Sequence, residues 1–133
     1  MPVDNGTGGT ITFGTSGFTA NISNINWDGM ERASIATSHL GTTTAHTFIP
    51  GDLYDPGELS LDIQFDPDEF PPINSAAETI TVTYPLSSGG TTAANWAATG
   101  FVTGASHVVP LEALMTGTIT VKLSGAITST DEA

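Results

Sequence analysis

An alternation of apolar and polar residues with a period of two runs through this chain and constrains its fold more than any other feature. Residues 58–66 place apolar side chains, among them Leu59 and Leu61, on one side of an extended segment and polar side chains on the other. Residues 79–84 and 118–123 alternate in the same way, with threonine at most of the outward positions. We therefore expect half-buried β-strands at these segments.

A strong turn signal, Asp28-Gly29, separates two strand-like runs at residues 25–27 and 30–35 and predicts a hairpin between them. Glycine and proline mark turns at intervals along the rest of the chain. Many short strands divided by such turns are typical of antiparallel β-sandwiches and small barrels. We expect a mainly β protein with an antiparallel sandwich or barrel-like fold.

Helical patterning is scarce. The alanine-rich segment 91–98, with Thr91 as a candidate N-cap, predicts one short helix, and residues 110–114 predict a helical turn with proline at its first position. The chain has the length of one domain, which we expect to span residues 1–133 with flexible arms at residues 1–9 and 127–133.

The charge balance excludes tight binding to anionic partners. Fourteen Asp and Glu residues stand against two Lys and Arg residues, which gives a formal net charge of −12. Phosphate contacts come mostly from Lys and Arg, so neither nucleic acids nor anionic membrane surfaces are expected as tightly bound ligands. The first residues lack the basic and apolar regions of a signal peptide, and no long apolar run is present, so we expect synthesis in the cytoplasm and no membrane span.

Hydroxyl side chains supply the polar surface that charges do not, because the chain contains 22 Thr and 11 Ser. Leu, Ile, Val and Phe together number 30 of 133 residues, so the hydrophobic core is thin. With no cysteine, no disulfide reinforces that core. We therefore expect stabilisation by association with other chains.

No residue pattern predicts catalysis or a cofactor. The three histidines, His39, His46 and His107, do not occur at the alternate-residue spacing that would direct two of them to one metal ion, which favours surface positions over zinc ligands. Paired carboxylates for glycoside hydrolysis lack flanking aromatic sugar platforms. We expect a protein that is not an enzyme.

The acidic segment at residues 52–69 admits two interpretations. One is a calcium site with oxygen ligands from residues 66–69, although the standard calcium-loop pattern is absent. The other is that aspartates of the segment form turns through side-chain hydrogen bonds, while Glu58 and Asp62 line a solvated face of the sheet. The aspartates assigned to turns are Asp52, Asp55, Asp66 and Asp68.

Several short motifs follow one another in a characteristic order. A strand ending near residues 37–38 is followed by a loop, by Phe-Ile-Pro-Gly at 48–51, by Asp-Pro-Gly at 55–57 and by the alternating strand. Towards the C-terminus, residues 100–104 precede a second motif at 115–125. This order, over most of residues 25–126, resembles the major tail tube proteins of long-tailed (siphophage-type) bacteriophages. That family commonly has an amphipathic helix after the alternating strand, where this chain is proline-rich.

The resemblance implies a structural protein of the virion, located in the phage tail. Family members form homo-hexameric rings that stack into a hollow tube, with other tail proteins at the tube ends, and double-stranded DNA passes through without tight binding. An acidic wall suits such a conduit, because it repels phosphate and keeps the duplex centred. The alternative from a different class is a phage capsid-decoration or adhesin-like β-sandwich binding module, which needs closed sheet edges and an exposed apolar patch.

Two sets of residues become candidates for function. Glu58, Asp62 and Asp66, on the polar side of the clearest strand, are candidates for lining the lumen, and the alternative is that this face looks outward. The loop at residues 37–47 resembles the loop that reaches the next ring in the family, and the alternative is an ordinary solvated loop. The ring-stacking candidates are Thr37, Ser38, His39, Leu40, Thr42, Thr43, Thr44, His46 and Thr47. The two terminal arms are further candidates for contacts between rings.

Overall fold

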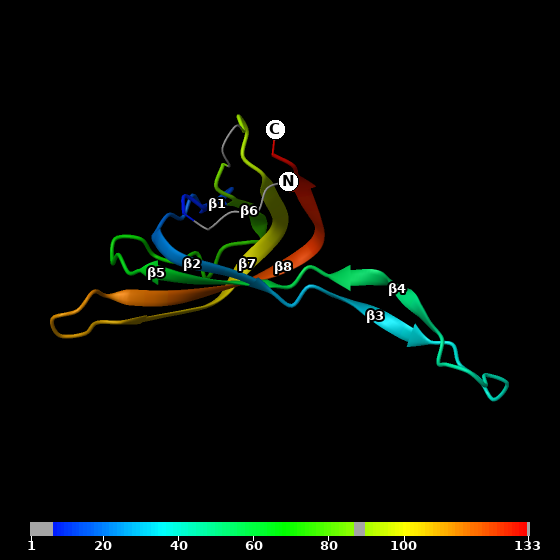
Figure 1. The fold of residues 1–133 in the computed structure, drawn as a ribbon. Coiled ribbons are helices and arrows are strands. Elements are labelled where there is room, and N and C mark those ends of the chain that lie inside the picture. Colours follow the sequence, from blue (N-terminus) through cyan, green and yellow to red (C-terminus); the bar gives the residue numbers. More distant parts are fainter. Residues whose placement is uncertain (1–6, 87–89, 133) are drawn as a thin grey trace.

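The computed structural model describes residues 7–86 and 90–132, and within these residues every regular element is a β-strand (Figure 1). The strands are β1 (Thr10–Phe13), β2 (Asn21–Asp28), β3 (Glu31–Ala36), β4 (Phe48–Asp55), β5 (Glu58–Gln64), β6 (Glu78–Thr83), β7 (Asn95–Val108) and β8 (Thr116–Thr130). The mainly β, antiparallel fold expected from the sequence is confirmed.

Six strands form one curled antiparallel sheet in the order β1-β6-β7-β8-β5-β2, which has the shape of a half-barrel (Figure 1). Its concave face holds the hydrophobic core, to which β5, β6 and β8 each contribute every second residue. The core consists of Phe13, Phe18, Leu59, Leu61, Ile63, Ile80, Val82, Ala98, Val102, Ile119, Val121 and Leu123. The alternation in the sequence therefore reports the sheet directly, because successive side chains of a strand point to opposite faces.

The remaining strands, β3 and β4, pair only with each other and form a ribbon that projects from the half-barrel (Figure 1). The hairpin predicted at Asp28-Gly29 is wrong, because β2 pairs with β5 while β3 pairs with β4. The chain passes from the sheet into the ribbon at Gly29 and returns at Gly57, and both glycines have positive φ angles, of 83° and 91°. Residues 21–64 thus form one long interrupted hairpin whose tip is the loop at 37–47.

The short helix predicted at residues 91–98 is also wrong. Strand β7 begins at Asn95, which pairs with Thr83 on one side and Thr130 on the other. Ala94 and Ala98 are buried, at 5% and 4% exposure. Pairing with two neighbouring strands therefore overrides the helix propensity of alanine. The segment 110–114 is a turn that joins β7 to β8.

The C-terminal arm differs from the expectation, because β8 continues to Thr130 and its last residues pair with β7. Ile127 packs against the core, and its backbone amide donates a hydrogen bond of 2.8 Å to the hydroxyl of Tyr54 on β4. Most of the predicted N-terminal arm, residues 1–6, lies outside the described residues, as does residue 133.

Candidate functional site

The ribbon of β3 and β4 has almost no buried surface of its own. Every residue of β3 is exposed, and on β4 only Gly51 is buried. Apolar side chains nevertheless recur along it, including Ile35, Phe48 and Leu53, which are 48%, 59% and 84% exposed. An isolated two-stranded hairpin is marginally stable in water. A ribbon with exposed apolar residues and no sheet beneath it is therefore a candidate contact surface for another chain.

The nine ring-stacking candidates gather at the far tip of this ribbon (Figure 1). Hydrogen bonds within the loop hold it in shape, since the hydroxyls of Thr37 and Thr47 lie 2.7 Å apart and Ser38 Oγ accepts from the Thr47 amide at 2.8 Å. The His39 amide donates to Thr42 Oγ1 at 3.0 Å. This internal network leaves Leu40 fully exposed at the tip.

A second projection, which the sequence did not single out, is the tip of the β7–β8 hairpin at residues 109–115. It points away from the β3–β4 ribbon, on the opposite side of the molecule (Figure 1). Val109, Leu111 and Leu114 are 69%, 93% and 61% exposed there. The signal in the sequence that could have identified this tip was the apolar run at residues 108–111, because an ordinary solvated turn carries polar residues.

Two of the three lumen-lining candidates lie on the same convex face of the sheet. Glu58 pairs with Asp28 on one side and Lys122 on the other. Asp62 pairs with Asn24 and Thr118, and its carboxylate oxygens accept hydrogen bonds from them at 3.4 and 3.3 Å. Directly opposed residues of neighbouring strands point to the same face. The structure therefore makes a polar face whose side chains are carboxylates, amides and hydroxyls with one nearby ammonium group.

The third candidate, Asp66, follows the end of β5 and is a turn residue. Its Oδ1 accepts the backbone amide of Asp68 at 2.9 Å, so the turn interpretation is confirmed for Asp66. The same holds for Asp55, whose Oδ1 accepts the amide of Gly57 at 2.8 Å and lies 3.3 Å from Lys122 Nζ. The Gly57 amide and the Lys122 ammonium lower the pKa of Asp55.

The three histidines lie in two separate places. His39 and His46 belong to the ribbon tip, whereas His107 stacks on Phe65 with ring centroids 3.9 Å apart and an interplanar angle of 3°. Among residues 7–86 and 90–132, no three His, Asp or Glu side chains come together in a metal-binding group. In the same residues there is no helix with the length and apolar character needed to cross a membrane.

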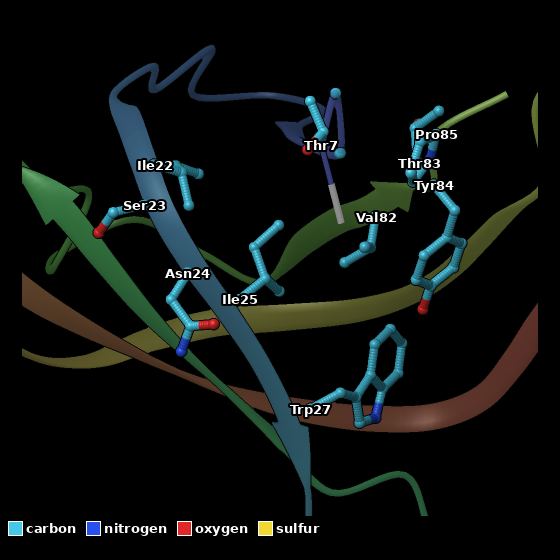
Figure 2. A pocket seen from close by; sticks show the side chains of 12 residues that line it. Thr7, Ile22, Ser23, Asn24, Ile25, Trp27, Val82, Thr83, Tyr84 and Pro85 are labelled. Carbon is cyan, nitrogen blue, oxygen red and sulfur yellow. The ribbon is translucent and has the colours of Figure 1, made fainter. Parts of the chain in front are cut away.

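The half-barrel does not close, and a pocket of about 600 Å³ occupies the gap between its two edges. Figure 2 shows Ile25 and Trp27 of β2 on one side and Val82 and Tyr84 of the β6 segment on the other. Trp96 packs edge-on against both Trp27 and Tyr84, with centroids 5.3 and 6.1 Å away. Burial raises the pKa of Tyr84. Since β1 and β2 are edge strands, each has one side without a neighbour in the described sheet.

No protein-family model and no curated protein sequence matches the chain. Among solved structures, a chain of the sheath/tube terminator of an extracellular contractile injection system, PVC, in its extended state has a TM-score of 0.75 at 13% identity, with 98% of both chains covered. A chain of the tube-terminating cap of the anti-feeding prophage, AFP, has a TM-score of 0.71 at 14% identity, with 98% of this chain and 91% of that chain covered. A chain of the AFP baseplate, 6-fold symmetrised, has a TM-score of 0.63 at 9% identity, over 92% and 90%.

At these identities the likeness shows a shared fold. Because the first match spans 98% of both chains, it covers the projections as well as the sheet. The fold is therefore one found in components of contractile, phage-tail-like injection particles, and it is not specific to the siphophage tail tube that the sequence motifs resemble.

Proposed function

We propose that this chain is a structural tail-tube protein that forms hexameric rings, and that the rings stack into a hollow conduit for double-stranded DNA in a virion. The observation that carries the proposal is the β3–β4 ribbon, which projects from the half-barrel with exposed apolar side chains and no core of its own. A monomer gains nothing from such a ribbon, whereas a stacked ring buries it.

Open sheet edges support assembly over the alternative of a decoration or adhesin-like module. A module that works as a monomer needs protected edges, because unpaired backbone groups recruit other strands. Here β2, eight residues long, is an edge strand that contains asparagine and serine but no lysine or proline. Its protective features are an irregularity in register between Ile22 and Asn24 and the charge of Asp28 at its end. A strand of this kind suits a sheet that continues into a neighbouring subunit.

Six-fold symmetry is supported by the neighbour from the AFP baseplate, which is described as 6-fold symmetrised. The other two neighbours come from structures of a tube terminator and a tube cap, which supports a location in a tail-like particle with other tail proteins as partners. The role that we propose is structural and requires no catalytic group.

For the lumen we propose the convex sheet face that carries Glu58 and Asp62, with Asp66 at its end. Carboxylates among hydroxyls and amides repel phosphate and offer few fixed cations to hold it. Lys122 is the exception on this face, and its ammonium group is paired with Asp55 at 3.3 Å. Double-stranded DNA suits this wall as a cargo, because the charge of DNA is uniformly negative and an acidic wall does not hold it.

Negative-stain microscopy and sedimentation of the purified chain test the proposal. We expect rings or tubes from the native sequence. The control is a deletion of residues 30–56, which leaves Gly29-Gly57 as a two-residue loop between Asp28 and Glu58, directly opposed in the native sheet. Glycine pairs are favoured in such loops, so the half-barrel should keep its β-type circular dichroism while assembly is lost. A native chain that stays monomeric at all concentrations would contradict the proposal.

A further inference from the structure

An apolar pocket of about 310 Å³ lies at the end of the half-barrel opposite the ribbon, where the segment after β5 folds against the β7–β8 hairpin. Its floor is formed by core residues Ile63 and Ile119, and its rim by Phe70 and Ile73. Phe70 is 78% and Ile73 is 39% exposed. Aromatic and aliphatic side chains thus surround a cavity that nothing in the described chain fills.

Contacts of Phe65 and of the rim loop fix the shape of this pocket. Phe65 donates its backbone amide to the Met115 carbonyl at 2.9 Å, and its ring stacks on His107. The loop that forms the rim is fixed by the Asp66 turn and by a 2.7 Å hydrogen bond from the Ile73 amide to the Pro71 carbonyl. A preformed apolar cavity loses little conformational entropy when a side chain enters it.

The side chain best suited to enter it is Leu40. It is fully exposed at the tip of the ribbon, and hydrogen bonds of the tip loop hold its backbone in position. The tip cannot reach the pocket of its own chain, because the ribbon tip and the β7–β8 hairpin, against which the pocket lies, are at opposite ends of the molecule (Figure 1). Leu40 can therefore enter this pocket only from another copy.

Charge points to the same pairing. Residues 37–47, which form the tip, contain no carboxylate and hold His39 and His46, whereas the β7–β8 tip at residues 109–115 carries Glu112. The loop beside the pocket carries Asp66, Asp68 and Glu69. Of the two exposed apolar tips, that of the ribbon is therefore the one that this acidic rim repels less.

We propose that the pocket between the segment 65–73 and the β7–β8 hairpin receives Leu40 of a second copy of this chain in the next ring. This inference rests on the proposed function, because it names the partner surface of the ring-stacking loop. A knob and its pocket at opposite ends of one molecule make a head-to-tail contact, which does not close when it joins successive rings along the tube axis. Rings joined in this way stack without a built-in limit to their number.

Cysteine pairs test the contact cleanly, because the native chain has no cysteine. A variant with both Leu40→Cys and Ile73→Cys should form, under oxidation, a ladder of disulfide-linked chains extending to many copies. Disulfides require Cα atoms within about 7 Å, so the bond reports direct contact. Matched controls pair Ile73→Cys with Leu53→Cys on the ribbon shaft or with Leu111→Cys on the other hairpin tip. Both of these leucines are highly exposed, as Leu40 is. Neither control should give the ladder.

Three results would overturn the proposal. One is a set of tubes in which the 40–73 pair stays reduced, which leaves the proposed function standing. Another is a ladder from the 73–111 pair instead, which would make the β7–β8 tip the occupant. The third is a chain that never assembles, which contradicts the proposed function as well. Leu40→Asp supplies a second measurement that does not depend on oxidation. We expect it to leave single rings and abolish tubes. Leu111→Asp, at a similarly exposed leucine outside the ribbon, should retain tubes. Tubes from Leu40→Asp would count against the contact.

Discussion

Gly29 and Gly57 pass each other backbone to backbone at the point where the half-barrel gives way to the ribbon. A Cβ atom on Gly29 would lie 3.4 Å from the Cα of Gly57, and a Cβ on Gly57 would lie 2.9 Å from the amide nitrogen of Met30 and closer still to the Asp28 carbonyl oxygen. The neck of the ribbon thus depends on two residues without side chains, both in the left-handed region.

Gly57→Ala should therefore destabilise the fold. We expect a loss of more than about 1 kcal/mol in the free energy of unfolding, measured with urea, from the positive φ together with the backbone clash. Gly17→Ala separates the two causes, because Gly17 has a φ of 66° but open space around its Cβ position. Gly104→Ala has open space and no positive φ, so it should be nearly neutral. A cost for Gly57→Ala no larger than that for Gly17→Ala would show that the neck can widen.

Glu78 makes stability depend on pH. The residue is 6% exposed, and its Oε1 accepts hydrogen bonds from the Ser16 amide at 2.9 Å, the Thr15 amide at 3.0 Å and the Ser16 hydroxyl at 3.0 Å. Burial raises the pKa of Glu78, but these hydrogen bonds outweigh burial and leave the pKa below its ordinary value. A carboxyl with a lowered pKa in the folded state stabilises the fold above its unfolded-state pKa, and that stabilisation is lost as pH falls through the folded-state pKa.

Glu78→Gln should cost about 1–2 kcal/mol near neutral pH, because hydrogen bonds to a charged acceptor are stronger than those to an amide. The difference from the native chain should shrink as the pH falls below the ordinary pKa of glutamate, about 4.3, and through the lower pKa of Glu78 in the folded state. Urea unfolding between pH 7 and pH 3 measures this. Glu112→Gln, at an exposed turn position, is the control and should show no comparable pH-dependent difference. A Glu78→Gln difference that stays constant with pH would exclude the charge as the cause.

The sequence predicted the sheet well wherever the alternation of apolar and polar residues within one strand shows which of its side chains are buried. The alternation at 58–66 identified the core residues of β5, because Leu59 and Leu61 reach the concave face by the pleat alone. The hairpin predicted at Asp28-Gly29 was wrong, because β2 pairs with β5, thirty or more residues away, and a local turn signal does not show such a distant partner. The helix predicted at 91–98 was wrong as well, because the small alanine side chains of this segment pack closely inside the sheet.

The candidate site, like the sheet, could be predicted from the sequence only in part. The loop at 37–47 was singled out by its resemblance to the loop that reaches the next ring in the tail tube family, and the structure places all its members at one tip. Its role in stacking stays a prediction. Asp66 was assigned to the strand face, yet the ladder of β5 ends at Gln64 and Pro67 has no amide to continue it. The pocket beside His107 was not predictable, because it arises only when the segment after β5 folds against the distant strands β7 and β8.

Raising the concentration of sodium chloride should promote assembly. Each subunit carries −12, and repulsion between exposed charges is screened over about 10 Å at 0.1 M salt and about 3 Å at 1 M. Apolar burial along the ribbon is not weakened by this screening. Sedimentation velocity at increasing salt should therefore show a rising fraction of rings or tubes. The variant lacking residues 30–56 should stay monomeric throughout, which separates screening from general salting-out. Assembly that weakens with salt would mean that ion pairs hold the subunits together.

The acidic face is the last point to be tested, by the double substitution Glu58→Lys with Asp62→Lys. Both side chains project from the convex face, on the side opposite Leu59, Leu61 and Ile63, so the core should remain folded. If this face lines the lumen, each ring gains a band of ammonium groups beside Lys122, and passing DNA gains affinity through counterion release. Asp66 is changed separately, because Asp66→Lys also removes the turn hydrogen bond to Asp68.

Tubes of the double variant should retain duplex DNA at low salt and release it at high salt, whereas native tubes should retain little at either. Co-sedimentation of labelled duplex with tubes measures retention, and delivery by particles that carry the variant measures passage, which should slow or stop. Glu112→Lys with Asp131→Lys makes the same change of charge outside this face and controls for net charge alone. If the control retains DNA as strongly, the effect belongs to the whole charge of the subunit. If the double variant forms normal tubes that deliver DNA normally, the face does not line the lumen, and if it cannot assemble, Glu58 and Asp62 lie between subunits.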